Sequence, residues 1–152
     1  MNMRSRRLVA IDYVLVRQLA DFRFELRTFL QFSESAALQA GLQPQQHQLL
    51  LQIAGAPDTL SPTVAYAAKR LALKHNSTVE LVDRSEREGL LRRVTNSEDR
   101  RQAILRLTQK GKRLIAKLSD DHAHELDERA PRLIATLDKI RSHSVAQAKS
   151  GA

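Results

Sequence analysis

The stretch that decides the fold runs from Ser61 to Gly111 and reads SPTVAYAAKRLALKHNSTVELVDRSEREGLLRRVTNSEDRRQAILRLTQKG. Its opening, Ser61–Pro62, predicts the start of a helix. A serine hydroxyl caps a helix, and a proline at the first helical position lacks only an amide hydrogen that would have no partner there. Apolar residues then recur at helical spacing as far as residue 72. The link formed by residues 72–75 is too short for anything but a turn.

A second helix is predicted to begin near Asn76 or Ser77. The pattern Ser77-x-x-Glu80 has the form of a capping box, in which the two side chains pair with backbone amides at the start of a helix. The helix is expected to run to Glu88, with Gly89 as its C-terminal stop. Two helices joined by so short a turn describe a helix-turn-helix, whose second helix can enter the major groove of DNA.

A basic hairpin is predicted to follow the two helices. Residues 90–95 and 103–108 are short β-type runs, and the polar residues between them favour a turn whose tip carries Arg100 and Arg101. Thr59–Leu60 is expected to form a very short strand against this hairpin. A helix-turn-helix followed by a basic hairpin is a winged helix, so the predicted fold class is mainly α with a small β-hairpin wing (α+β).

Two further helices are predicted before this stretch. From Ile11 the apolar residues follow steps of three and four, which predicts one long amphipathic helix reaching the neighbourhood of Leu38. Gly41 is expected to end it. A second helix is predicted to begin at Gln43–Pro44 and to end at Gly55.

A long helix is predicted after Gly111, with an interruption at Pro131, because proline lacks the amide hydrogen and clashes with the preceding turn. A final helix is then expected to fray into residues 146–152. The first and last helices carry apolar stripes larger than a winged helix of this size needs to cover itself. They either fold onto their own domain or cover a second subunit.

Composition narrows the class of protein. The 152 residues include 25 Lys+Arg and 17 Asp+Glu, a formal net charge of +8, and the excess is concentrated between Arg84 and Arg113. A local positive field suits a polyanion. The absence of cysteine excludes disulfides and thiolate metal sites. No apolar run is long enough to span a bilayer, and no signal-type stretch follows the basic first seven residues, so we expect a cytoplasmic protein with no membrane partner.

The sequence also resembles the MarR family (multiple antibiotic resistance regulators). The residues that carry the resemblance are Leu71, Leu81-Val82-Asp83-Arg84, Gly89-Leu90, Asp99-Arg100-Arg101 and Leu107-Thr108-Gln109-Lys110-Gly111. The match is close from about Leu42 to Gly111, and the Asp-x-Arg wing with Leu-Thr-x-x-Gly six residues on is its specific signal. One departure is Ser85, where the family usually has a leucine after Asp-Arg.

This resemblance implies a single chain, 1–152, organised around a winged-helix DNA-binding domain at 42–111. Helices at 11–40 and 112–148 are then expected to be dimerisation helices that interleave with those of a second subunit. The implied function is a homodimeric, sequence-specific transcription regulator on a pseudo-palindromic operator in double-stranded DNA, usually a repressor released by a small ligand. The alternative is a DNA-architectural protein with little sequence preference.

Candidate DNA-binding residues lie on the second helix of the motif. Helical spacing places Thr78, Leu81, Val82 and Ser85 on an inward face and leaves the other face for DNA. The residues expected to contact DNA here are Asn76, Ser77, Val79, Glu80 and Arg84, with Arg93 on the following strand. Asparagine and serine can hydrogen-bond bases, and glutamate can accept from a cytosine amino group. The alternative that the polar residues merely cap the helix stays open. Asp83 is expected to pair with Arg84 or Arg93.

The wing supplies the remaining candidates, Asp99, Arg100 and Arg101. The resemblance implies that Arg101 enters the minor groove, with Asp99 steadying it, since a narrow minor groove has an enhanced negative potential. The alternative is two arginines solvated on a turn.

Other chemistry is weakly indicated. His122 and His124 are two residues apart on a predicted helix and so point to different faces, which argues against a metal site and against the remaining rival, a small enzyme using this region. We expect no catalytic residues and no cofactor. His47 lies near where family members bind small aromatic acids, which makes it a weak effector-binding candidate. The alternative is an ordinary half-buried histidine.

Overall fold

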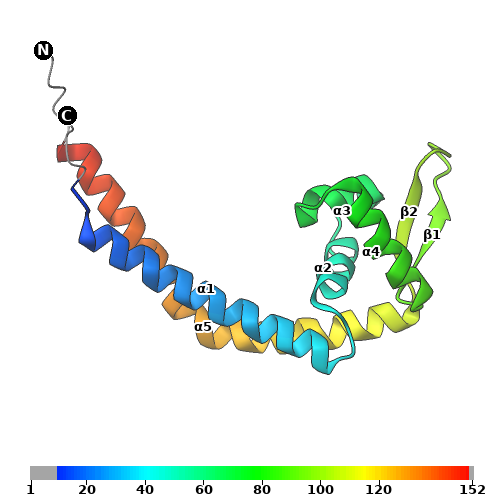
Figure 1. The fold of residues 1–152 in the computed structure, drawn as a ribbon, viewed down its shortest axis with the longest axis horizontal. Coiled ribbons are helices and arrows are strands. Elements are labelled where there is room, and N and C mark those ends of the chain that lie inside the picture. Colours follow the sequence, from blue (N-terminus) through cyan, green and yellow to red (C-terminus); the bar gives the residue numbers. More distant parts are fainter. Residues whose placement is uncertain (1–9, 151–152) are drawn as a thin grey trace, which may run out of the picture. The chain divides into compact units, whose positions relative to one another are not determined.

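The structure is a computed structural model that describes residues 10–150, with side chains as far as Gln147. In chain order its elements are α1 (Tyr13–Gln39), α2 (Pro44–Ala54), α3 (Val64–Leu71), α4 (His75–Arg87), β1 (Leu91–Thr95), β2 (Ala103–Leu107) and α5 (Gln109–Ser150) (Figure 1). The two strands form an antiparallel hairpin. The expected fold class, mainly α with a small hairpin wing, is confirmed.

The chain divides into two compact units. We call Met1–Leu30 with Glu125–Ala152 the helical unit, and Gln31–His124 the winged unit. Each is described separately below.

In the helical unit the first part of α1 lies beside the last part of α5. Arg129 forms ion pairs with Glu125 on its own helix and with the buried Glu25 of α1, 3.6 Å away. Towards the other end, His143 Nε2 lies 2.6 Å from a carboxylate oxygen of Asp12. The pair is therefore held together by polar contacts at both ends.

The expectation that Pro131 interrupts the last helix is wrong, because α5 is continuous from Gln109 to Ser150 with Pro131 inside it. A proline removes one backbone hydrogen bond and crowds the preceding turn. Contacts with α1 through Arg129 before it and His143 after it hold both halves in place, which offsets this local cost.

The core of the winged unit is aliphatic. Its largest fully buried apolar side chains are Leu42, Leu49, Leu50, Leu81, Val82, Leu90, Leu91, Leu105 and Leu118. They come from α2, α4, both strands, α5 and the connections, so one core joins the helix-turn-helix to the wing. The predicted limits of α2 are confirmed, with Pro44 at its first position and Gly55 as its cap.

The start of α3 differs from the sequence expectation. Thr63 is the capping residue, and its hydroxyl accepts a hydrogen bond from Tyr66 N at 3.2 Å. Pro62 lies outside the helix, where its carbonyl accepts from Leu105 N of β2 at 2.8 Å. The strand expected at Thr59–Leu60 does not form. This segment contacts the hairpin through the bond at Pro62 instead.

The turn between α3 and α4 is tighter than expected. Ala72 takes the left-handed conformation, φ 52°, and ends α3 at once. The next helix therefore begins at His75, and Lys74 is its capping residue, with no side-chain cap. The predicted capping box at Ser77 and Glu80 is wrong, because Ser77 already lies inside the first turn of α4.

The predicted end of α4 at Gly89 is confirmed. Gly89 has φ +69°, a conformation that favours glycine, and the next amide, Leu90 N, donates to Ser85 O at 2.9 Å. Gly89 N donates to Glu86 O at 2.9 Å. This pair of bonds is a Schellman motif, which turns the chain from α4 directly into β1.

Candidate nucleic-acid interface

The second helix of the motif, α4, has one buried and one exposed face. Thr78, Leu81, Val82 and Ser85 are all buried, as the spacing predicted. The candidate contacts Asn76, Ser77, Glu80 and Arg84 are exposed, and Val79 is half-buried. The candidates therefore share one face of α4, with Arg84 in its last turn and the others towards its start.

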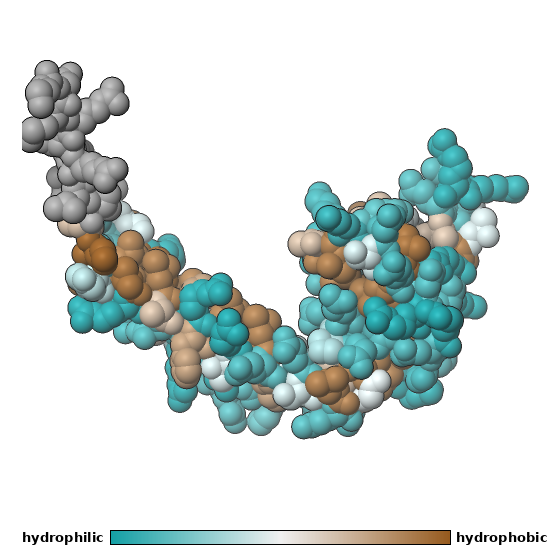
Figure 2. Space-filling view, viewed as in Figure 1, coloured by the Kyte–Doolittle hydropathy of each residue, from teal (hydrophilic) through white to brown (hydrophobic). Residues whose placement is uncertain are grey.

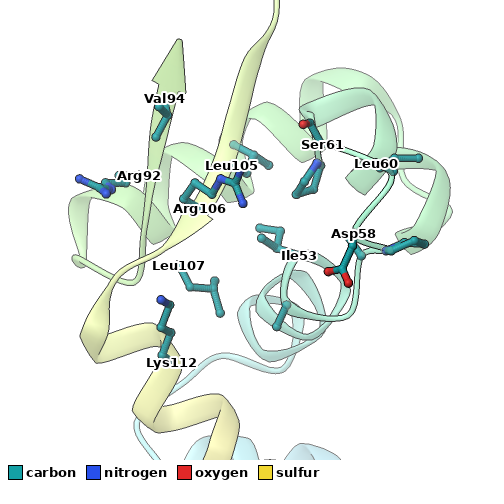
Figure 3. Close-up of a pocket in the computed structure, with 14 residues that line it drawn as sticks. Ile53, Asp58, Leu60, Ser61, Arg92, Val94, Leu105, Arg106, Leu107 and Lys112 are labelled. Atoms are coloured by element: carbon teal, nitrogen blue, oxygen red, sulfur yellow. The ribbon is translucent and has the colours of Figure 1, made fainter. Parts of the chain in front are cut away.

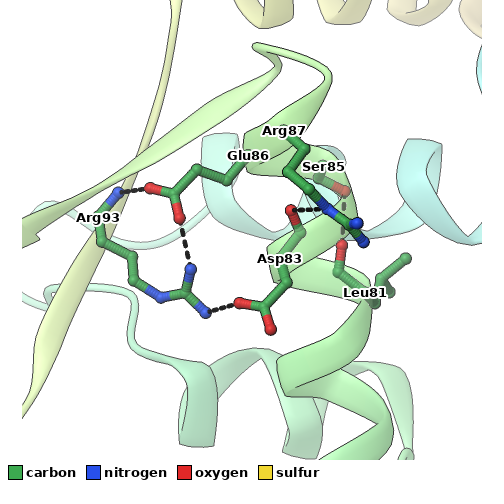
Figure 4. Close-up of polar contacts among 6 residues, drawn as sticks. All are labelled: Leu81, Asp83, Ser85, Glu86, Arg87 and Arg93. Carbon is green, nitrogen blue, oxygen red and sulfur yellow. Dashed lines mark hydrogen bonds and ion pairs between the residues drawn. The ribbon is translucent and has the colours of Figure 1, made fainter.

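Ser85 fills its place in the core without leaving it open to solvent. It is fully buried, and its hydroxyl donates to Leu81 O at 2.8 Å, one turn back on α4 (Figure 4). A leucine here must find room for extra carbon atoms in an interior that is already closed.

Ser85→Leu is therefore expected to destabilise the protein by about 1–3 kcal/mol through overpacking. Ser85→Ala, which only removes the hydroxyl, is the control and should change the free energy of unfolding by less than about 1 kcal/mol. Urea titration of both variants measures this. A leucine variant more stable than the parent protein would show that the site contains unfilled space.

Arg93 of β1 braces the wing against α4 (Figure 4). Its guanidinium donates to Asp83 Oδ1 and to Glu86 Oε2, each at 2.5 Å. Its backbone amide also donates to Glu86 Oε1 at 2.8 Å. Partial burial alone would lower the pKa of Arg93, but the hydrogen bonds to the two carboxylates outweigh it and raise that pKa. Of the two partners open to Asp83 in the sequence, the structure selects Arg93.

At the tip of the wing, Asp99 and Arg101 are joined by hydrogen bonds. Asp99 Oδ1 accepts hydrogen bonds from Arg101 N at 3.0 Å and from Arg101 Nε at 3.2 Å. The Arg101 side chain is otherwise 91% exposed. The expected contact of Asp99 with Arg101 is thus present, and Arg100 beside it is exposed. Whether either arginine enters a minor groove stays a prediction.

The Leu-Thr-x-x-Gly motif joins α5 to the end of α4. Thr108 Oγ1 donates to Gly89 O at 2.6 Å and accepts from Gly111 N at 3.1 Å. A Cβ on Gly111 would lie 2.1 Å from Leu90 O, so only glycine fits. Lys110 Nζ donates to Glu88 O at 2.9 Å. The motif was visible in the sequence, but its role in fixing the base of the wing required the fold.

His47 and His122 form a buried polar cluster in the winged unit. His47 is 2% exposed, more buried than expected, and its Nδ1 has no hydrogen-bond partner in the described part of the chain. The two ring centroids are 4.9 Å apart. His122 Nδ1 and Nε2 lie 2.6 Å from Leu118 O and 2.8 Å from Ser33 Oγ. Within residues 10–150, no group of three His, Asp or Glu side chains is placed to hold a metal ion.

Burial, followed by the positive charge of His122, lowers the pKa of His47 below its ordinary value of 6.5. The folded state therefore favours neutral His47, and below about pH 6.5 the unfolded chain binds the proton more readily. Stability contributed by this group is present above that pH and is lost as the pH falls through the lowered, folded-state pKa.

Between pH 7 and 5, we expect His47→Gln to show a shallower loss of unfolding free energy than the parent protein. His75→Gln, at the exposed start of α4, is the control for replacing a histidine outside this cluster. Urea titrations at stepped pH measure both. Equal slopes for the parent and His47→Gln would mean that His47 titrates alike in both states.

Fold and surface together define a class, a winged-helix protein with an exposed helix face and an arginine-tipped wing. Residues 40–102 match the family model described as MarR family. This match covers the helix-turn-helix and most of the wing, so this part of the chain is similar to MarR family proteins. Among curated proteins, none matches the chain.

Solved structures share the fold. AbsC, a MarR family transcriptional regulator from Streptomyces coelicolor, is 18% identical, with 94% of this chain and 99% of that chain covered and a TM-score of 0.70. A MarR family protein from Bacillus stearothermophilus is 23% identical, with 90% and 99% covered and a TM-score of 0.68. A point mutant of Staphylococcus aureus MepR bound to an oligodeoxyribonucleotide is 20% identical, with 86% and 95% covered and a TM-score of 0.56.

Within the described residues, every helix is too short or too polar to cross a lipid bilayer.

Proposed function

We propose that this protein is a transcription regulator of the MarR type, a homodimer that binds a pseudo-palindromic operator in double-stranded DNA and acts as a repressor released by a small ligand. The observation that carries the DNA-binding part is the exposed face of α4. Its polar residues lie at the start of the helix, the end that meets base edges in helix-turn-helix proteins. The MepR mutant, which shares the fold, is bound to an oligodeoxyribonucleotide, and this supports DNA binding as the function.

Side chains at the start of α4 are available for bases. The sequence left open whether Asn76 and Ser77 cap the helix, but the cap is Lys74, without a side-chain hydrogen bond. Neither residue, nor Glu80, has a side-chain partner in the described part of the chain. We assign these three to base contacts, with Val79 beside them and Arg84 towards a phosphate.

The arginines divide into two roles. Arg93 is engaged by Asp83 and Glu86, so we assign it to positioning the wing, with any DNA contact secondary to that. Arg100 and Arg101 are exposed at the tip, and we assign Arg101, which donates hydrogen bonds to Asp99, to the minor groove.

Dimerisation is assigned to 11–40 and 112–148, and DNA binding to 42–111. The range assigned to DNA binding, 42–111, lies within the winged unit. Support for the first comes from the helical unit, where large apolar side chains stay exposed along both helices (Figure 2). The most exposed on α1 and α5 themselves are Tyr13, Phe24, Ile134 and Val145. Apolar surface of this extent favours a partner, and a second copy is the partner proposed here.

Release by a small aromatic acid rests on the family resemblance. His47, with an unpartnered Nδ1, remains the candidate contact, although its burial means that the winged unit must open to admit a ligand there.

Titration of fluorescent duplex DNA at stepped salt concentrations tests the proposal. Lysine and arginine contacts release counterions from phosphates, so affinity should fall by orders of magnitude between about 50 and 200 mM salt. Affinity that does not respond to salt would contradict it. The ratio of affinities for operator and random DNA separates a specific regulator from an architectural protein, for which the ratio is near one.

Arg101→Ala should weaken operator binding more on A·T-rich than on G·C-rich flanks, because a minor-groove arginine reads groove width as well as charge. Arg100→Ala is the matched control, since it removes an adjacent arginine that has no hydrogen bond to Asp99. It should lose a similar factor on both flanks. Binding titrations on the two flank types measure this. If Arg101→Ala also lowers operator affinity by the same factor on both flank types, the wing contributes only positive charge.

A further inference from the structure

The base of the wing contains a pocket of about 540 Å³ (Figure 3). Its walls are the end of α2 and the following turn, the segment leading to α3, both strands, and the first turn of α5. This volume falls within the range of small-molecule sites. Its floor is apolar, with Ile53 6% exposed and Leu105 fully buried.

The charges around this pocket do not balance. Its lining includes Arg92, Arg106 and Lys112 against one acid, Asp58, a difference of two positive charges. Within residues 10–150 none of these four side chains forms an ion pair. Arg93, the neighbour of Arg92 on the same strand, has two carboxylates at 2.5 Å. Carboxylates therefore neutralise Arg93, whereas the cations that line the pocket have no ion-pair partner in the described residues.

Strand register concentrates this charge. Arg92 and Arg106 are directly opposite in the ladder, an arrangement that destabilises a hairpin when the charges are alike. Because side chains alternate along a strand, both lie on the face opposite to that of Arg93, which meets α4. Leu105 and Leu107 lie on the Arg93 face and also line the pocket, so residues from both faces of the hairpin border it.

Figure 3 shows how the charged groups are arranged. Arg106 extends from β2 towards Ile53, Lys112 points up along Leu107, and Asp58 faces them from the turn after α2. Arg92 stands at the outer edge with its guanidinium turned outward. Arg106 and Lys112 are therefore the cations directed at the pocket, whereas the guanidinium of Arg92 points away from it.

We propose that this pocket binds a small organic dianion with an apolar body, a phosphate monoester or a dicarboxylate. Its two negative charges can be met by the two cations directed at the pocket, Arg106 and Lys112, and an arginine binds either group through parallel hydrogen bonds. The apolar body covers Ile53, Leu105 and Leu107. This site is separate from His47 and from the exposed face of α4.

Such a ligand touches both strands of the hairpin that carries Arg100 and Arg101. An effect on DNA affinity follows only if the wing contacts DNA, so that consequence rests on the proposed function. Ligand binding to the DNA-free protein does not depend on it, and the two can fail separately.

Calorimetric titration of the full-length protein without DNA tests the site. Phenyl phosphate and phthalate represent the two dianion sources, benzoate is the monoanion with a similar body, and inorganic phosphate lacks the body. At least one dianion should bind about tenfold or more tightly than benzoate and inorganic phosphate. The dianion that binds more tightly shows whether the pocket prefers a phosphate monoester or a dicarboxylate. Equal affinity for benzoate, or no binding of either dianion, would overturn the proposal.

Variants locate the site. Arg106→Gln and Lys112→Gln should each weaken dianion binding about tenfold or more. Arg113→Gln, an exposed arginine one residue beyond Lys112 that does not line the pocket, should leave it unchanged within about twofold. Equal losses in all three would mean a diffuse surface charge and would overturn the site.

The same variants separate a ligand site from a phosphate contact. Without ligand, Arg106→Gln should keep the parent affinity and salt slope for duplex DNA. A reduced slope with unchanged dianion binding would place Arg106 at the DNA backbone and overturn the assignment. If the parent protein binds a dianion but does not bind DNA, the proposed pocket stands and only the proposed function is contradicted.

Discussion

The double variant Leu19→Glu/Leu30→Glu is expected to be monomeric and to bind operator DNA about 10²–10⁴-fold less tightly than the parent protein. The two leucines are 43% and 47% exposed on α1. They are eleven residues apart, about three helical turns, so they share a face. Two glutamates there place charge in the proposed subunit contact and repel the same residues of the second copy.

The loss of affinity has a simple origin. A dimer binds its second half-site as an intramolecular event, and a monomer lacks that advantage. Ser35→Glu is the control, because it adds a negative charge to an exposed polar position of the same helix. It should stay dimeric. Sedimentation and DNA titration measure both properties, and a double variant that remains dimeric with parent affinity would remove these residues from the subunit contact.

Arg93→Ala is expected to loosen the wing and to lower operator affinity by about tenfold or more. It removes both guanidinium hydrogen bonds and leaves the charges of Asp83 and Glu86 without a cation beside the exposed face of α4, although the amide of residue 93 can still donate to Glu86. Two uncompensated carboxylates repel DNA phosphates. The cost in unfolding free energy should be smaller, about 1–2 kcal/mol, because solvent screens these half-exposed groups.

Arg92→Ala is the matched control for this change. Arg92 is the preceding arginine of β1, and it faces Arg106 instead of a carboxylate. Its removal should leave stability unchanged or slightly raised and should not release the wing. Hydrogen exchange of the β1 and β2 amides measures the loosening. Equal protection in Arg93→Ala and the parent protein would show that the ion pairs do not hold the wing.

The spacing of apolar residues and the positions of helix-ending glycines predicted most of the helices and strands. Steps of three and four placed α1, and Gly41 and Gly89 ended helices because both have positive φ. The hairpin followed from two β-type runs around a polar turn. These features depend on local sequence, which is why they were accessible without the fold.

Several boundaries depended on tertiary contacts instead. Pro62 resembled the first residue of a helix, but its carbonyl pairs with Leu105 of β2, which keeps it extended. Ala72 carries no signal for a left-handed residue, so the early start of α4 was not visible. Pro131 was outweighed by the contacts of α5 with α1 on either side of it.

The candidate site was predicted unevenly. The family resemblance implied that Asp99 steadies Arg101, and the hydrogen bonds between them are present in the structure. Arg93 was left open as the partner of Asp83, since the choice depends on how β1 meets α4. The pairing of Arg92 with Arg106 required the strand register, and so did the pocket beneath it.

Selection of bound sequences from a random pool of duplex DNA, using the full-length protein, tests the central claim most directly. A homodimer with α4 in the major groove should recover a pseudo-palindrome with half-sites about 10 base pairs apart, centre to centre. Recovery of no enriched sequence, or of a single unrepeated half-site, would contradict the account of a dimeric, sequence-specific regulator.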